Sequence, residues 1–226
     1  MQTSIKALAL CVALLTGAQT LDAMAGPIPA PTITVTGLEY AQPTRAVITV
    51  GAMKFESVLV GAFDTRAAGK PDAFETWCVD ILQNTYIGSP VSDYFIKTGA
   101  QALGAETASL LERLATESLA KVHDATTSAA FQFATWELLA EKSGTFDLSK
   151  GDFYAFNVSD GSLALANTWL KNLPGAGSPT TYKLSVLSSA THQDLGTFTK
   201  VPEPSTLAAL GIGLLGFFGA RRRRKS

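Results

Sequence analysis

The last 26 residues constrain this chain most, because they combine three segments of different physical character in a fixed order. Residues 201–204 (Val-Pro-Glu-Pro) contain two prolines, which fix φ and remove backbone donors, so no helix runs through them. Residues 205–220 are uncharged and mostly apolar, which predicts a hydrophobic transmembrane helix. A basic cluster follows: Arg221, Arg222, Arg223, Arg224 and Lys225. Because such a cluster stays on the cytoplasmic side, the order predicts a C-terminal membrane stop with the protein body outside.

This order resembles the PEP-CTERM sorting segment, which substrates of exosortase, a membrane transpeptidase-like protease, carry at their C-terminus. The resemblance rests on Pro202, Glu203 and Pro204, on the apolar run and on the basic cluster. The alternative is a Pro-containing linker before an ordinary anchor. The 16 residues of the run span roughly 24 Å, less than the ~30 Å hydrocarbon core. Such a short span suits a transient anchor that is later cleaved, and the resemblance implies processing by exosortase.

The N-terminus has the features of a secretory signal peptide at residues 1–25. A weakly basic start precedes apolar residues 7–17, and a small-x-small site at residues 23–25 predicts cleavage before Gly26. We therefore expect export by the general secretion machinery, and the resemblance to the PEP-CTERM sorting segment implies a Gram-negative-type bacterium. The tail would then hold the protein briefly in the inner membrane before it reaches the cell surface or the extracellular matrix.

The exported body is predicted to span residues 26–200, with residues 201–226 as the sorting segment. The body contains 12 Lys and Arg against 17 Asp and Glu, a net charge of −5. This mildly acidic balance lacks the basic footprint of a nucleic-acid-binding protein, so we expect no nucleic-acid partner. With His123 and His192 as the only histidines, neither a His-rich metal site nor a Ser-His-Asp set is predicted, and we expect no cofactor.

The body is predicted to have an α+β fold in which a helical segment, at about residues 104–173, interrupts a β framework. Alternating, β-branched stretches predict strands within residues 33–63, 74–82 and 182–199. The polar residues 64–72, which include a glycine and a proline, predict a loop. Apolar residues at helical spacing predict three helices, at residues 106–122, 127–142 and 162–173.

Cys78 is the only cysteine that remains after the predicted signal cleavage. Exported proteins usually pair their cysteines, so a single one indicates a partner chain, a free thiol or a different kind of bond.

The stretches around Cys78 and Gln132 together resemble the Cys–Gln thioester domain of bacterial surface adhesins. In that family, a cysteine on a strand bonds to a glutamine early in a helix, within the motif apolar-Gln-x-x-apolar-Trp. Phe131, Gln132 and Trp136 match this motif, whereas Thr135 occupies a position that is apolar in the family. A structural interpretation stays open, in which Cys78 is a small buried hydrophobe and Gln132 an ordinary helix residue.

The resemblance covers about residues 74–156 and implies a specific reaction. The Cys78 thiolate would attack the Gln132 side-chain amide, release ammonia and leave an internal thioester, which an amine or hydroxyl on a partner could open. Three aromatic residues are expected to wall a dry pocket around the bond: Trp77, Phe131 and Trp136.

We therefore predict a non-enzymatic surface or extracellular-matrix protein, which in the bolder version is a covalent adhesin that uses its thioester once. Its partner would be a surface polysaccharide or another nucleophile-bearing molecule. The alternative is a secreted hydrolase that acts on polysaccharide or peptide, which would require two carboxylates at glycosidase spacing in a cleft.

Overall fold

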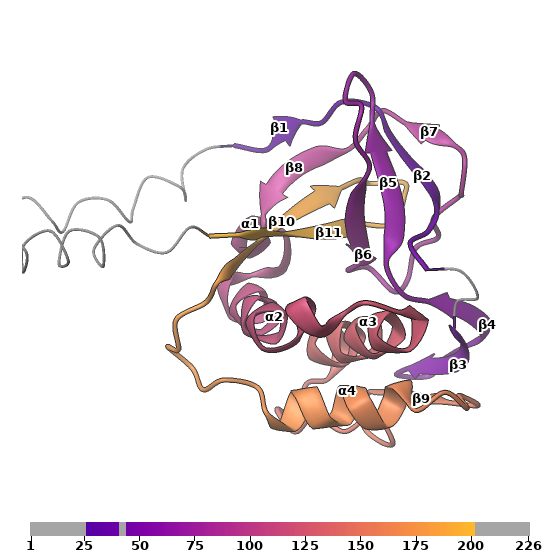
Figure 1. The fold of residues 1–226 in the computed structure, drawn as a ribbon, viewed down its shortest axis with the longest axis vertical. Helices are drawn as coiled ribbons and strands as arrows, with labels where there is room; N and C mark the ends of the chain where they lie inside the picture. Colours follow the sequence, from indigo (N-terminus) through magenta and orange to yellow (C-terminus); the bar gives the residue numbers. More distant parts are fainter. Residues whose placement is uncertain (1–25, 41–43, 202–226) are drawn as a thin grey trace, which may run out of the picture.

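The computed structural model describes residues 26–40 and 44–201 (Figure 1). The predicted signal peptide at residues 1–25 and the predicted transmembrane helix at residues 205–220 lie outside this part. Within it, a curled β-sheet packs against a layer of helices, and a smaller sheet lies at one end of that layer (Figure 1). The main hydrophobic core fills the space between the helices and the two sheets.

The larger sheet has eight antiparallel strands in the order β1-β8-β10-β11-β6-β5-β2-β7. Its strands are β1 Ile28–Pro29, β2 Ile33–Leu38, β5 Phe63–Ala67, β6 Phe74–Cys78, β7 Pro90–Val91, β8 Phe95–Thr98, β10 Tyr182–Ser188 and β11 Leu195–Lys200. The first and last parts of the body therefore meet in one sheet. A second small core forms on this sheet around Ile33, Tyr94 and Leu195.

The smaller sheet has the order β4-β3-β9, formed by β3 Thr44–Val50, β4 Met53–Val60 and β9 Phe153–Phe156. Its buried residues alternate with partly exposed ones, as expected for a sheet with one face on the core. Phe153 and Ala155 are buried, whereas Tyr154 and Phe156 are partly exposed.

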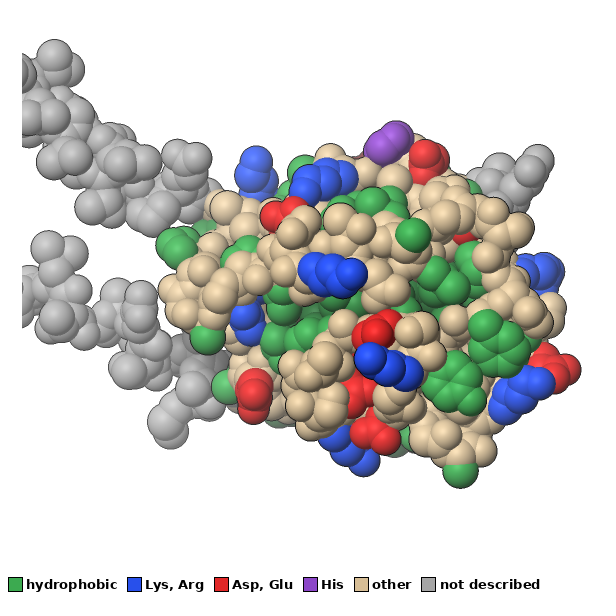
Figure 2. Space-filling model, turned by 90° about the horizontal axis from the view of Figure 1, so that it is seen from below, with side chains coloured by type: hydrophobic (Ala, Val, Ile, Leu, Met, Phe, Trp, Pro, Cys, Tyr) green, Lys and Arg blue, Asp and Glu red, His purple; other side chains and the backbone are tan. Residues whose placement is uncertain are grey.

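On the face of the molecule seen in Figure 2, hydrophobic side chains lie among positively charged Lys and Arg and negatively charged Asp and Glu side chains.

The helices are α1 Gly99–Leu103, α2 Ala105–Ser118, α3 Ala125–Ala140 and α4 Ser162–Lys171, with a short 3-10 turn η1 at Leu119–Lys121. The central helix, α3, is buried on all sides from Ser128 to Leu138. A helix that is apolar all round belongs in a core. It begins at Ala125 because the Asp124 side chain accepts a hydrogen bond from Thr127 N at 2.8 Å.

The predicted α+β arrangement is confirmed, because α2, α3 and α4 match the three predicted helices and each predicted β region contains strands. The strands β1, β7 and β8 and the helix α1 lie outside the predicted regions. The loop predicted at residues 64–72 is wrong for its first part: residues 64–67 belong to β5, where they pair with β2 and β6. The helical segment also contains a strand, β9, which adds a third strand to the smaller sheet. The predicted C-terminal helix concerns residues outside the described part.

Candidate functional site

Cys78 is the last residue of β6, and Gln132 lies two turns into α3. Cys78 N donates to Gln132 Oε1 at 3.0 Å, and Gln132 Nε2 donates to Cys78 O at 2.9 Å. The fold thus brings together two residues that are 54 positions apart in the sequence. Both are almost completely buried, with exposed fractions of 2% and 1%.

The end of strand pairing leaves room for this contact. β5 pairs with β6 only as far as Thr76, and on the other side of β6 Val79 N donates to Asp194 O at 3.0 Å. The N–H and C=O of Cys78, which face the β5 side, therefore have no strand partner. The Gln132 side-chain amide makes the two hydrogen bonds that a neighbouring strand would otherwise make. We call this pair of hydrogen bonds between the Gln132 amide and the Cys78 backbone the clasp. It satisfies two buried backbone groups, which is a structural role in its own right.

The three predicted pocket residues are also buried near this contact. The Trp77 and Phe131 rings pack with centroids 4.4 Å apart, and Phe131 meets Phe198 edge-on at 5.6 Å. Trp136 follows Gln132 by one turn of α3 and packs against Phe153, with ring centroids 6.2 Å apart. All three side chains are buried, with exposed fractions of 1%, 0% and 3% for Trp77, Phe131 and Trp136.

The Cys78 thiol is held in its neutral form. Burial raises its pKa to about 12, and the carboxylates of Asp80 and Asp194 act in the same direction. The indole N–H of Trp136 and a backbone hydrogen bond lower the pKa but do not offset burial. The sulfur donates to Asp80 O at 3.2 Å, so in the resting protein its proton points toward a carbonyl.

The turn after Cys78 is fixed by its own side chains and by a glutamine from the β10–β11 hairpin. Asp80 Oδ1 accepts from Leu82 N at 3.0 Å, so this carboxylate caps the turn. Gln193 Nε2 donates to Asp80 O at 3.1 Å and to Gln83 O at 2.8 Å. Tyr94 in turn donates its hydroxyl hydrogen to Gln193 O at 2.8 Å.

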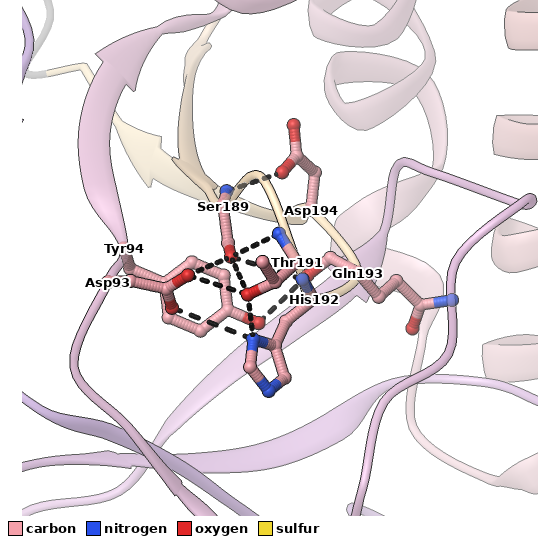
Figure 3. Close-up of polar contacts among 7 residues, drawn as sticks. All are labelled: Asp93, Tyr94, Ser189, Thr191, His192, Gln193 and Asp194. Carbon is pink, nitrogen blue, oxygen red and sulfur yellow. Dashed lines mark hydrogen bonds and ion pairs between the residues drawn. The ribbon is translucent and has the colours of Figure 1, made fainter.

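Sequence reasoning missed the polar cluster that shapes this hairpin (Figure 3). Asp93 Oδ2 accepts from Ser189 Oγ at 2.9 Å and from Thr191 Oγ1 at 2.7 Å. His192 Nδ1 lies 2.8 Å from Thr191 Oγ1. The same ring nitrogen of His192 lies 3.6 Å from Asp93 Oδ1, but the Ser189 hydroxyl donates to Asp93 and not to the imidazole, so the set is not a Ser–His–Asp relay. The polar run between two strands could have indicated only a turn.

A cavity of about 580 Å³ borders the turn that follows Cys78. Its walls come from this turn, from the β3–β4 turn, from α1 and α2 and from the end of α3. The lining is mostly apolar and carries three charged residues: Asp80, Lys142 and Asp152. In the described part of the chain, no group of three or more His, Cys, Asp and Glu side chains could hold a metal ion.

The family of the PEP-CTERM protein-sorting motif matches residues 200–224. The tail is a PEP-CTERM sorting motif. It starts at Lys200, the last residue of β11, and includes Pro202, Glu203 and Pro204, the apolar run and all four arginines of the basic cluster. The PEP-CTERM motif implies export, membrane anchoring at the C-terminus and processing by exosortase. Residues 202–226 lie outside the described part, within which no helix is long and apolar enough to cross a membrane.

Two solved structures are similar to the chain that carries this PEP-CTERM motif. The N-terminal thioester domain of a surface protein from Clostridium perfringens, a cysteine-to-alanine mutant, aligns with a TM-score of 0.43 at 12% identity, covering 70% of this chain and 100% of that one. The N-terminal domain of the Streptococcus pyogenes pilus tip adhesin Cpa aligns with a TM-score of 0.41 at 16% identity, covering 74% and 99%. No curated protein matches the chain significantly.

Proposed function

We propose that this chain is an exported surface or matrix protein that forms a thioester between Cys78 Sγ and Gln132 Cδ and uses it to attach covalently to a partner. The observation that carries the proposal is the pair of hydrogen bonds, at 3.0 Å and 2.9 Å, between the Gln132 amide and the Cys78 backbone. These bonds hold the amide beside the residue that carries the sulfur, and proximity of this kind lowers the barrier to reaction.

In the forming step, the Cys78 thiol loses its proton and the sulfur attacks Gln132 Cδ. The C–N bond of the amide breaks, and the nitrogen leaves as ammonia with the proton from the thiol. The negative charge that develops on Oε1 faces the Cys78 backbone N–H, which already donates to this oxygen at 3.0 Å. A donor fixed in this position stabilises the tetrahedral intermediate.

In the attachment step, an amine or hydroxyl of the partner attacks the same carbon. Its proton passes to the departing sulfur, and the partner ends bonded to the Gln132 acyl group. Since each molecule reacts once, this chemistry is not enzymatic. The cavity beside the Cys78 turn is large enough for the approaching segment of a partner, such as a surface polysaccharide or an amine-bearing chain.

Intact mass of the purified body tests the proposal. The protein should be lighter than its sequence by one ammonia, and methylamine should add its full mass and expose a free thiol. Cys78→Ala and Gln132→Ala should each show the unmodified mass and no reaction with methylamine. A fresh wild-type protein with unmodified mass and no response to methylamine would leave the clasp with a purely structural role at the end of β6.

A further inference from the structure

The indole N–H of Trp136 is a buried hydrogen-bond donor that has no acceptor in the resting fold. Trp136 has an exposed fraction of 3%, and its Nε1 has no hydrogen-bond partner among the described residues. Buried N–H groups are nearly always paired, so an orphan of this kind calls for a physical explanation. Trp77 shows the contrast, because its Nε1 donates to Glu75 Oε1 at 3.0 Å.

The position of Trp136 on α3 brings this donor to the helix face that carries Gln132. It follows Gln132 by four residues on α3, so the two side chains lie on the same face of the helix. Its N–H reaches the surroundings of the Cys78 sulfur closely enough to favour the thiolate. The rings of Phe133 and Phe153, each 6.2 Å from the Trp136 ring by centroid, fix the indole plane.

We propose that Trp136 Nε1 donates a hydrogen bond to the Cys78 sulfur whenever that sulfur is negatively charged, and that Trp136 is therefore a catalytic residue of thioester formation and opening. This inference rests on the proposed function. The indole keeps its hydrogen throughout. In formation it stabilises the thiolate before attack on Gln132 Cδ, and in opening it stabilises the departing sulfur until the proton from the nucleophile arrives.

The resting geometry explains why the donor is idle. The neutral thiol already donates to Asp80 O, and a neutral sulfur is a weak acceptor. Once the sulfur ionises, that carbonyl repels it, and the negative charges of Asp80 and Asp194 disfavour it as well. The indole N–H, which has no hydrogen-bond partner in the resting fold, is then free to donate to the charged sulfur. A charge-assisted hydrogen bond is about twice as strong as a neutral one.

The test compares Trp136→Phe with Trp169→Phe, which removes an indole from α4 in the same core. Trp136→Phe should slow the loss of ammonia and the opening by methylamine by about tenfold or more, whereas Trp169→Phe should leave both rates near wild type. Replacement of Trp136 by benzothienylalanine, which keeps the ring shape and lacks the N–H, should reproduce the effect if the phenylalanine variant folds poorly. Unchanged rates in both Trp136 variants would overturn the inference.

A second readout separates this inference from the thioester itself. If the wild type never loses ammonia, its free Cys78 thiol can be treated with a small neutral thiosulfonate at pH 9, where the thiolate is the reactive form. If the thioester does form, methylamine-opened protein supplies the same thiol. In either case Trp136→Phe should lower the rate of modification about tenfold. Equal rates would remove Trp136 from the chemistry even if the thioester is real.

Discussion

At the scale of single residues, Glu137 stands out because it is a completely buried acid. Its Oε1 accepts from Asp147 N at 2.7 Å, while Oε2 has no hydrogen-bond partner in the described structure. Burial raises its pKa from 4.5 to about 7, and the nearby charges of Glu141 and Asp147 add to this. The folded protein therefore keeps Glu137 protonated at pH values where the unfolded chain has already ionised it.

This difference gives a signed prediction for Glu137→Gln. Between pH 4.5 and 7 the folded state binds more protons at this residue than the unfolded state, so wild-type stability should fall as the pH rises through this window. The amide cannot ionise, so the variant should match wild type near pH 4 and exceed it by up to about 3 kcal/mol at pH 8. Urea denaturation at the two pH values measures both differences.

Glu141→Gln serves as the control with the opposite sign. The Glu141 carboxylate accepts from Ser143 N and from Asp152 N, each at 2.8 Å, and these bonds lower its pKa. Replacing this carboxylate by the amide of glutamine should therefore destabilise the body at neutral pH. A Glu137→Gln protein with the same pH dependence as wild type would show that Glu137 is already ionised in the fold.

At the scale of elements, α3 decides where the candidate site lies, because it carries Gln132 and Trp136 together. Its first turn depends on Asp124, which caps the helix through Thr127 N. Asp124→Ala should cost about 1 kcal/mol in the free energy of unfolding, while Asp124→Ser, which keeps a capping oxygen, should cost much less. If chemical denaturation shows the same loss of unfolding free energy for Asp124→Ala and Asp124→Ser, the capping oxygen contributes nothing to stability.

The contact between β6 and β11 supplies a second element-scale prediction. A methyl group at Gly196 would lie 2.8 Å from Val79 Cγ1 and 3.2 Å from Leu184 Cδ1, so a larger residue here would force Val79 or β11 to shift. Gly196→Ala should destabilise the body by about 1–3 kcal/mol. Gly175→Ala, where a methyl meets nothing within 4 Å, is the matched control. A thermal midpoint that both variants share with wild type would contradict this packing.

The positions of most helices and strands could be predicted from the sequence. The periodic apolar residues of α2 and α4, the apolar run of α3 and the β-branched stretches located most elements, and the lone cysteine with its glutamine motif pointed to the Cys78–Gln132 contact. The strand β9 is only four residues long, and its pairing with β3 depends on chain more than 100 residues away. The contacts of Asp93 with Ser189 and Thr191 likewise depend on long-range folding, so no local pattern indicates them.

At the scale of the whole molecule, the two ends of the body leave on the same side. The chain enters through β1 and leaves after β11 at one side, and the β3, β4 and β9 sheet lies at the other (Figure 1). The β3–β4 turn, which lines the cavity next to the Cys78 turn, therefore lies on the side of the described body away from both of its ends.

The mass of the native exported protein tests the central claim most directly, because one measurement reports both ends of the chain and the state of the Cys78–Gln132 pair. We predict a chain that begins at Gly26, has been cleaved within the C-terminal sorting segment and is lighter than the corresponding sequence by one ammonia. A chain of full, unmodified mass that does not react with methylamine would contradict the account.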